Sequence, residues 1–276
     1  DGMVDILIGN YNQINQVLLN DDSSSYSEAI DLPGGAMNTT SIAAADINGD
    51  GLVDMIIGNL NQKNQVLLND GSGSFTEVID LPGGDIWTRS IAAADINGDG
   101  MLDIVIGNYN QINQVLLNDA TGTDTDALAL PGAVTSTESI AAADINGDGM
   151  VDILIGNYDN YKNQLLLNDG NGSYSEAIDL PGGDMDTWSI SAADVNGDGT
   201  VDIILGNKDQ NNQLLLNDGS GSYSEAIDLP GGAMNTESIA AADVNGDGMV
   251  DILIGNNSQK NQLLLNDGNG SYSEAT

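Results

Sequence analysis

The segment SIAAADINGDG, residues 41–51, decides the fold because it recurs at a fixed spacing. Identical copies begin at Ser90 and Ser139, and close variants begin at Ser189 and Ser238, so the spacings are 49, 49, 50 and 49 residues. A repeat of this length that is made of short apolar runs, without helical periodicity, is typical of the blades of a β-propeller. We therefore expect an all-β chain.

Each repeat contains four expected strands separated by turn residues. The first is rich in alanine, as at 41–46, and the second is an unbroken aliphatic run, as at 54–58, which indicates burial on both faces. The third resembles 64–70, and the fourth, at 173–180, alternates between polar and apolar residues. The motif LPGG is expected to end the units, at Leu32, Leu81, Leu180 and Leu229.

The number of copies predicts about six four-stranded blades in one domain over residues 1–276. The second strand occurs six times but the alanine-rich first strand only five times, so the N-terminal blade is incomplete or the sequence is a window on a longer array. The expected blades span about 1–35, 36–84, 85–132, 133–183, 184–232 and 233–276.

Composition excludes several classes of function. Acidic residues number 42 against five basic ones, giving a net charge of −37, which argues against nucleic acid or anionic lipid as a partner. The chain has no Cys and no His, and no apolar run approaches the length of a membrane span. Disulfides and histidine-based zinc sites are therefore absent. Without these nucleophiles and bases we expect a non-enzymatic protein.

The loop after each first strand has the pattern DxNxDGxxD, whose oxygen-rich side chains suit calcium. Alternate residues of a tight loop direct their oxygens toward one centre, the glycine permits the bend, and the backbone carbonyl of the seventh residue adds a ligand. We predict about five structural Ca²⁺ ions, bound by Asp46, Asn48, Asp50, Leu52 and Asp54; Asp95, Asn97, Asp99, Met101 and Asp103; Asp144, Asn146, Asp148, Met150 and Asp152; Asp194, Asn196, Asp198, Thr200 and Asp202; and Asp243, Asn245, Asp247, Met249 and Asp251.

Three other interpretations of this loop are weaker. An EF-hand requires a glutamate at the twelfth position, where the first loop has Ile57, and it requires flanking helices. Magnesium seldom occupies an all-protein cage. A metal-free turn rich in Asx residues explains one copy better than five copies in register. Asp1 and Asp5 correspond to the fifth and ninth positions of a sixth loop, and they form a partial metal site at most.

The loop DINGDGMVDILIGN and the following NQVLLNDG resemble the FG-GAP and VCBS repeats of integrin α-subunit propellers and bacterial secreted proteins. The resemblance covers essentially the whole chain and implies a calcium-binding propeller loop at the residues named above. The literal FG and GAP signatures are absent. The resemblance is therefore nearer to the bacterial VCBS-like group, and integrin ligands are not carried over.

The loops between the second and third strands are the more variable ones, and they lie with the LPGG linkers on the face opposite the calcium loops. Aromatic and basic residues beside Asn and Gln suggest a ligand face for carbohydrate, formed by Tyr11, Trp87, Arg89, Tyr109, Tyr158, Tyr161 and Trp188. The alternative is that these are ordinary loop residues and that the tryptophans fill gaps between blades.

Two functional hypotheses follow. The first is an extracellular recognition or adhesion module that binds a glycan or a protein ligand through this face. The second is an architectural repeat protein of a surface layer, adhesin stalk or filament that assembles with copies of itself through open strand edges. The extracellular or cell-surface location is inferred from the resemblance and from the supply of calcium outside cells.

Overall fold

The computed structural model describes residues 4–20, 25–118, 127–132, 134–170, 172–268 and 271–275, and every regular element in them is a β-strand. They form two compact units, residues 1–95 with 99–130 and residues 96–98 with 131–276. No helix in the described residues is long and apolar enough to cross a membrane. The all-β prediction is confirmed, and a single domain over the whole chain stays a prediction.

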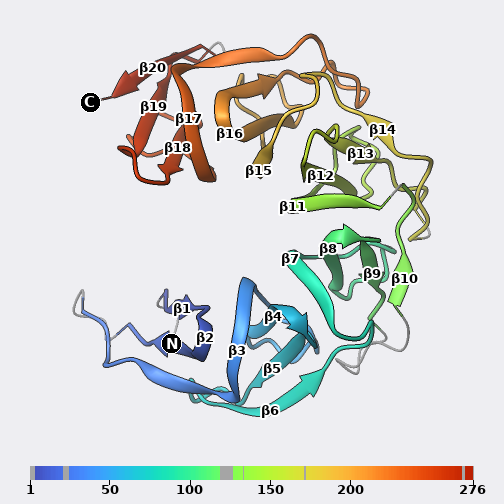
Figure 1. The fold of residues 1–276 in the computed structure, drawn as a ribbon, viewed down its shortest axis with the longest axis vertical. Coiled ribbons are helices and arrows are strands. Elements are labelled where there is room, and N and C mark those ends of the chain that lie inside the picture. Colours follow the sequence, from blue (N-terminus) through green and yellow to red (C-terminus); the bar gives the residue numbers. More distant parts are fainter. Residues whose placement is uncertain are drawn as a thin grey trace. The chain divides into compact units, whose positions relative to one another are not determined.

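The first complete repeat is an antiparallel meander of four strands (Figure 1). It uses the end of β3 (Ile30–Ala45), then β4 (Asp54–Gln62), β5 (Gln65–Asn69) and β6 (Phe75–Asp80). Ala43 pairs with Ile56, Ile56 with Val66, and Val66 with Ile79. The four strands follow the order expected from the sequence.

The same meander recurs along the chain. In the first unit it is formed by β7 (Ile86–Ala94), β8 (Asp103–Gln111), β9 (Gln114–Leu116) and β10 (Ala127–Ala129). The second unit contains β11 (Thr135–Ala143), β12 (Asp152–Tyr158), β13 (Gln164–Leu166), β14 (Ile178–Asp179), β15 (Thr187–Ala193), β16 (Asp202–Leu215), β17 (Ile227–Ala242), β18 (Asp251–Asn256), β19 (Gln262–Asn266) and β20 (Tyr272–Ala275). The N-terminal repeat has β1 (Ile6–Ile8), β2 (Tyr11–Leu18) and the start of β3.

The second strand of every complete repeat before the last forms the core, as its aliphatic sequence predicts, whereas in the last repeat Leu253 of β18 is 39% exposed. In β4 the residues Asp54 to Asn59 are all buried, and β8, β12 and β16 have the same pattern. Clusters between successive repeats join these strands, such as Leu154 with Ile203 in the second unit. Side chains on both faces of the strand are thus removed from water, which stabilises the fold in proportion to the apolar area buried.

Two expected boundaries differ from the sequence interpretation. LPGG forms a turn at 81–84 and 180–183, but in β3 and β17 it lies inside a continuous 16-residue strand that leaves one repeat and enters the next. The expected loops between the second and third strands at 11–15 and 207–212 likewise lie inside β2 and β16. Asn12 and Asp209, at φ +58° and +55°, bulge the strands there, and the linker of the next repeat supplies the pairing.

The fourth strand is shorter than predicted in the second unit. Of the expected 173–180 only Ile178–Asp179 is a strand, with one isolated bridge between Asn168 and Tyr174. Both strand residues are exposed. An outermost strand with so little buried surface has few side-chain contacts to hold it against the third strand.

Within each unit, a buried polar relay links one repeat to the next at the end that carries the loops between the second and third strands. The backbone N–H of Asn59 donates to Asn64 Oδ1 at 2.8 Å, and Asn64 Nδ2 donates to Thr88 Oγ1 of the next repeat at 2.9 Å. Asn157, Asn163 and Thr187 repeat this arrangement in the second unit. Each bond satisfies a group that would be costly to bury alone.

Candidate functional site

The DxNxDGxxD loops connect the first and second strands of the repeats, and their first aspartate organises the turn. Asp46 Oδ1 accepts the N–H of Gly49 and Asp46 Oδ2 accepts that of Gly51, both at 2.8 Å. These glycines have φ of +73° and +88°, a conformation that side chains with a Cβ rarely adopt. The same two bonds recur from Asp144, Asp194 and Asp243.

The fifth-position aspartate remains at the surface. Asp50 Oδ1 accepts the N–H of Leu52 at 2.8 Å, and Asp50 Oδ2 accepts Asn48 Nδ2 at 3.0 Å. The side chains of the seventh residue lie over the following NDG turn, where Met150 lies beside Gly170. Thr200 instead donates its hydroxyl to Asp198 Oδ1 at 2.6 Å.

The ninth-position aspartate is fully buried in all five copies, at Asp54, Asp103, Asp152, Asp202 and Asp251. In the first copy, Oδ2 accepts the N–H of Ile47 at 3.1 Å and Oδ1 accepts that of Asn69 at 2.8 Å. This carboxylate therefore ties the loop to the end of the third strand, whether or not it also contacts an ion.

Burial raises the pKa of Asp54, and the negative charges of Asp50 and Asp46 add to the rise against the opposing N–H bonds. The pKa values of Asp152 and Asp202 are raised for the same reasons. The three carboxylates of one loop thus repel one another. A cation within the loop would relieve this repulsion.

The donor set fits a hard cation in its chemistry. Carboxylate, amide and backbone oxygens are the ligands that Ca²⁺ prefers. Among the described residues, however, no three acidic side chains already surround one metal position, because the oxygens accept N–H groups within each loop. Ion binding would therefore require some of these bonds to be exchanged for metal ligation.

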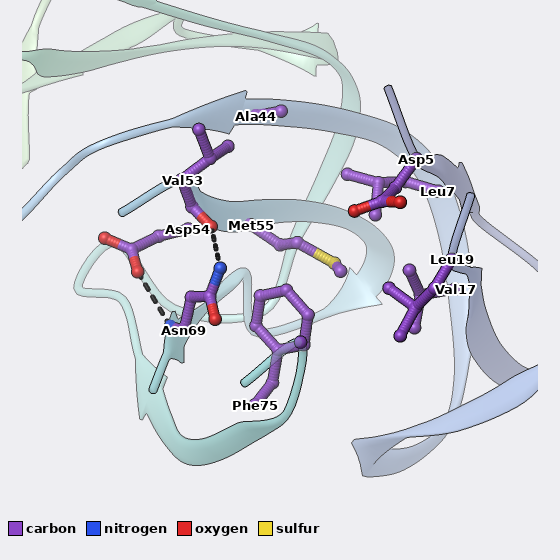
Figure 2. Close-up of a pocket in the computed structure, with 11 residues that line it drawn as sticks. Asp5, Leu7, Val17, Leu19, Ala44, Val53, Asp54, Met55, Asn69 and Phe75 are labelled. Carbon is purple, nitrogen blue, oxygen red and sulfur yellow. Dashed lines mark hydrogen bonds between the residues drawn. The ribbon is translucent and has the colours of Figure 1, made fainter. Parts of the chain in front are cut away.

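Of the two candidate ligands of the partial sixth loop, one lies within the described residues. Asp1 lies outside the described residues. Asp5 is exposed, and its Oδ1 accepts the N–H of Asn20 at 2.8 Å. Asn20 is the equivalent of Asn69, which bonds Asp54 in the same way (Figure 2). Asp54, however, is fully buried, whereas Asp5 is exposed.

An asparagine that the sequence interpretation did not single out connects successive loops. Asn217 Nδ2 donates to the carbonyl of Ile145 in the preceding repeat at 2.7 Å and to that of Val201 in its own repeat at 2.9 Å. Asn168 and Asn266 form equivalent pairs of bonds. The sequence does signal this position, because an Asn-Asp pair stands at or just after the end of the third strand in every repeat. In the sequence, however, this Asn resembles an ordinary turn residue.

The proposed ligand face contains an aromatic cluster in the first unit. Trp87 stacks on Tyr109 with ring centroids 5.9 Å apart, and Arg89 lies 5.3 Å from the centre of the Tyr109 ring. Trp87 remains 43% exposed. Its backbone N–H donates to Gln111 Oε1 at 2.7 Å, so an amide side chain lies next to the cluster.

A second cluster lies in the other unit. Tyr158 and Trp188 meet edge to face at 6.0 Å, and Lys208 Nζ lies 4.4 Å from the Trp188 ring and 5.4 Å from the Tyr158 ring. Trp188 Nε1 is buried with no hydrogen-bond partner among the described residues. Lys208 was not predicted. The exposed Tyr11 and Tyr161 make no ring contact within the described chain.

A protein-family model described as an FG-GAP-like repeat matches residues 1–57, 46–106, 95–155, 144–205 and 194–254. The chain belongs to the FG-GAP-like repeat family. Each of the last four matches begins at the first aspartate of one loop and ends within the second strand that follows the next loop. The FG-GAP part of the resemblance seen in the sequence is thereby confirmed.

Solved structures show that this FG-GAP-like chain has a β-propeller-like fold. A lectin of Agrocybe aegerita, described as recognising non-reducing terminal N-acetylglucosamine, aligns with a TM-score of 0.70 at 20% identity over 98% of this chain and 75% of its own. The biofilm matrix protein Bap1 of V. cholerae aligns at 0.54 and 20% identity over 86% of this chain and 39% of Bap1.

A third structure, BBS1N in complex with ARL6DN, aligns at 0.59 and 12% identity over 97% of this chain and 83% of its own. No curated protein matches the sequence. At these identities the likeness concerns the fold alone.

Proposed function

We propose that this chain is a calcium-stabilised propeller of about six blades that recognises a glycan or protein ligand through the face carrying Trp87. The observation that carries the proposal is the exposed Trp87 stacked on Tyr109 beside Gln111. A flat aromatic surface packs against the apolar side of a sugar ring, and neighbouring amides bond its hydroxyls. The lectin likeness supports a glycan as the first ligand to test.

Calcium is proposed as the structural cofactor of the five complete loops. Its support is the mutual repulsion of three carboxylates per loop in a chain whose net charge is −37. Asp46, Asn48, Asp50 and the Leu52 carbonyl would hold the ion in the first loop. The ion would supply charge neutralisation and cross-linking of the turn.

The proposed role is binding without catalysis, outside the cell. The carboxylates gather in the loops and at the strand ends, where backbone N–H groups hold them, which suits structural roles. A calcium-dependent fold suits surroundings rich in calcium. These proposals rest on the family and on the chemistry of the loops.

The decisive experiment is a glycan array with saturating calcium, followed by Trp87→Ala on every ligand that binds. We expect at least one glycan class to bind and the substitution to abolish its binding. Tyr26→Ala is the matched control, since Tyr26 is 42% exposed and takes no part in either aromatic cluster. An array without signal, or binding unchanged by Trp87→Ala, would refute the glycan proposal.

Architectural assembly is the second candidate. It is favoured by the exposed Ile6 of β1, a strand that within the described residues pairs with β2, and by the likeness to a biofilm matrix protein. Open strand edges pair readily with other chains. Sedimentation of the purified chain over a range of concentrations separates this candidate from recognition, because a strictly monomeric profile at high concentration would contradict assembly.

A further inference from the structure

Lys208 of β16, in the second unit, occupies a position at which the other repeats have no cation. Its counterparts in the other repeats are Tyr11, Leu60, Tyr109, Tyr158 and Asn257. The ammonium of Lys208 lies 4.4 Å from the centre of the Trp188 ring and 5.4 Å from that of the Tyr158 ring. All three residues are half-buried. One cation therefore lies beside two aromatic rings that come from successive repeats.

The ammonium of Lys208 has no carboxylate partner in the described part of the chain. Lys63 and Lys162 each form an ion pair, with Asp80 at 3.1 Å and with Asp179 at 3.0 Å. Lys208 forms none within the described ranges, although the sequence contains 42 acidic residues. A half-buried ammonium without a counter-ion keeps its capacity for a charge-assisted hydrogen bond to an anion.

The indole of Trp188 supplies a second donor without an acceptor. Its Nε1 is buried and has no hydrogen-bond partner among the described residues. A buried N–H that lacks a partner costs free energy, which an acceptor would recover. The carboxylate of Asp186, two residues away, instead bonds to the backbone N–H of Asn160 at 3.3 Å. Two donors without an acceptor at one place indicate a site for an anionic group.

The next repeat shows what kind of group this place accommodates. There the counterpart of Trp188 is Glu237, and the counterpart of Lys208 is Asn257. Glu237 Oε1 accepts Asn257 Nδ2 at 2.9 Å. In that repeat the chain thus provides its own carboxylate to the donor. In the repeat of Lys208 the donor carries a full charge, but an indole stands where the carboxylate would be.

The loop that follows Tyr158 is held beside these rings in a strained conformation. It is one residue longer than its counterparts, and Asp159 and Asn160 have φ of +63° and +60°. Residues with a Cβ rarely adopt this conformation, and such strain is concentrated at functional sites. The bond from Asn160 to Asp186 fixes the loop next to the strand that carries Trp188. Because Asn160 is exposed, its amide is available to ligand hydroxyls.

We propose that Lys208, Trp188 and Tyr158 form a second binding site, for an acidic sugar of the hexuronate class. The flexible side chain of Lys208 shifts from the Trp188 ring toward the ligand carboxylate and bonds it, which uncovers the indole. The Trp188 Nε1–H then donates to an oxygen of the ligand. The rings pack against the C–H side of the sugar.

An acidic sugar suits this arrangement better than an acidic peptide. A hexuronate holds its carboxylate on a rigid ring with an apolar side, so the aromatic rings and the ammonium engage one preorganised group. A peptide carboxylate lies on a flexible side chain, which loses conformational freedom on binding. The inference extends the proposed recognition function to a second site, and it does not rest on Trp87 or on the ion in the loops.

The test uses the fluorescence of Trp188. The chain has two tryptophans, so Trp87→Phe leaves Trp188 as the only indole reporter. This variant is titrated in calcium buffer, at constant ionic strength, with glucuronic acid, with galacturonic acid and with glucose as the neutral match. We expect a saturable change in emission with at least one uronic acid and none with glucose. Because Trp87 is absent, the result is separate from the outcome of the glycan array for the Trp87 site.

Two further variants in the same background locate the site. Lys208→Met should weaken uronate binding roughly tenfold or more, because a charge-assisted hydrogen bond is lost. Lys260→Met is the matched control and should bind as before, since Lys260 is exposed and makes no ring contact within the described chain. Circular dichroism confirms that both variants fold.

Four results would each overturn the proposal. They are no change with either uronic acid, an equal change with glucose, an unaltered affinity in Lys208→Met, and an equal response to acetate or to N-acetyl-aspartate amide. The last result would show a site for any carboxylate, or for an acidic peptide, in place of a sugar site.

Discussion

The two ends of each repeat obey different rules. At the end that carries the DxNxDGxxD loops, Asp152, Asn168 and their counterparts bond to their own and to neighbouring repeats, and these residues are the same in every complete copy. At the other end, one position is occupied in turn by Tyr11, Leu60, Tyr109, Tyr158, Lys208 and Asn257. Residues bonded across repeats are thus uniform, and residues that face solvent vary. Stability should therefore depend on the uniform residues, including the buried Asn64–Thr88 relay at the second end, and binding on the variable positions of that end.

Removal of calcium should produce the largest effect on this comparison. An ion that binds the folded state with a concentration 100-fold above its Kd stabilises by about 2.7 kcal/mol per site. We expect the thermal midpoint, followed by circular dichroism, to collapse in excess EGTA, with about five ions counted by calorimetry. Unchanged melting would show that the loops are metal-free turns.

Asn217→Ala should have the next largest effect. It removes a 5% exposed amide that donates to Ile145 and Val201, so two carbonyls lose their donor and the free energy of unfolding should fall by about 2–3 kcal/mol. Urea denaturation in saturating calcium measures this. Asn257→Ala, at an exposed asparagine bonded to Glu237, is the control and should change it by less than about 0.5 kcal/mol. Equal losses in the two variants would contradict the comparison.

Lys208→Met should have the smallest effect. It removes the cation from Trp188 and Tyr158, and a half-exposed cation–π contact contributes about 0.5–1 kcal/mol. The same denaturation assay applies, with Lys260→Met as the exposed control. A loss several times larger would mean that the aromatic clusters hold the repeats together and are not primarily a binding surface.

The sequence predicted what depends on local pattern. Aliphatic runs such as Asp54–Gly58 indicated buried strands, and the DxNxDG spacing located tight loops whose glycines have positive φ. The continuous strand through Leu32–Gly35 was not predicted, because proline and glycine normally signal turns. Its pairing comes from the bulged β2 that lies beside it.

The cross-repeat bonds were also missed. Asn64 and Thr88 are 24 residues apart, and Asn217 and Ile145 are 72 apart, so no local pattern joins them. Asn and Thr are common in turns and strands, which hid their buried role. Lys208 of β16 was missed because its partners lie on other strands: Tyr158 ends β12 of the preceding repeat, and Trp188 lies in β15.

The asparagine that joins each DxNxDGxxD loop to the one before it has a consequence for how the gene can change in length. Asn168, Asn217 and Asn266 each reach back by one repeat only. A recombination event that adds or deletes one whole unit in frame therefore restores every such bond at the new junction. Arrays of different length can arise from this gene without a compensating substitution.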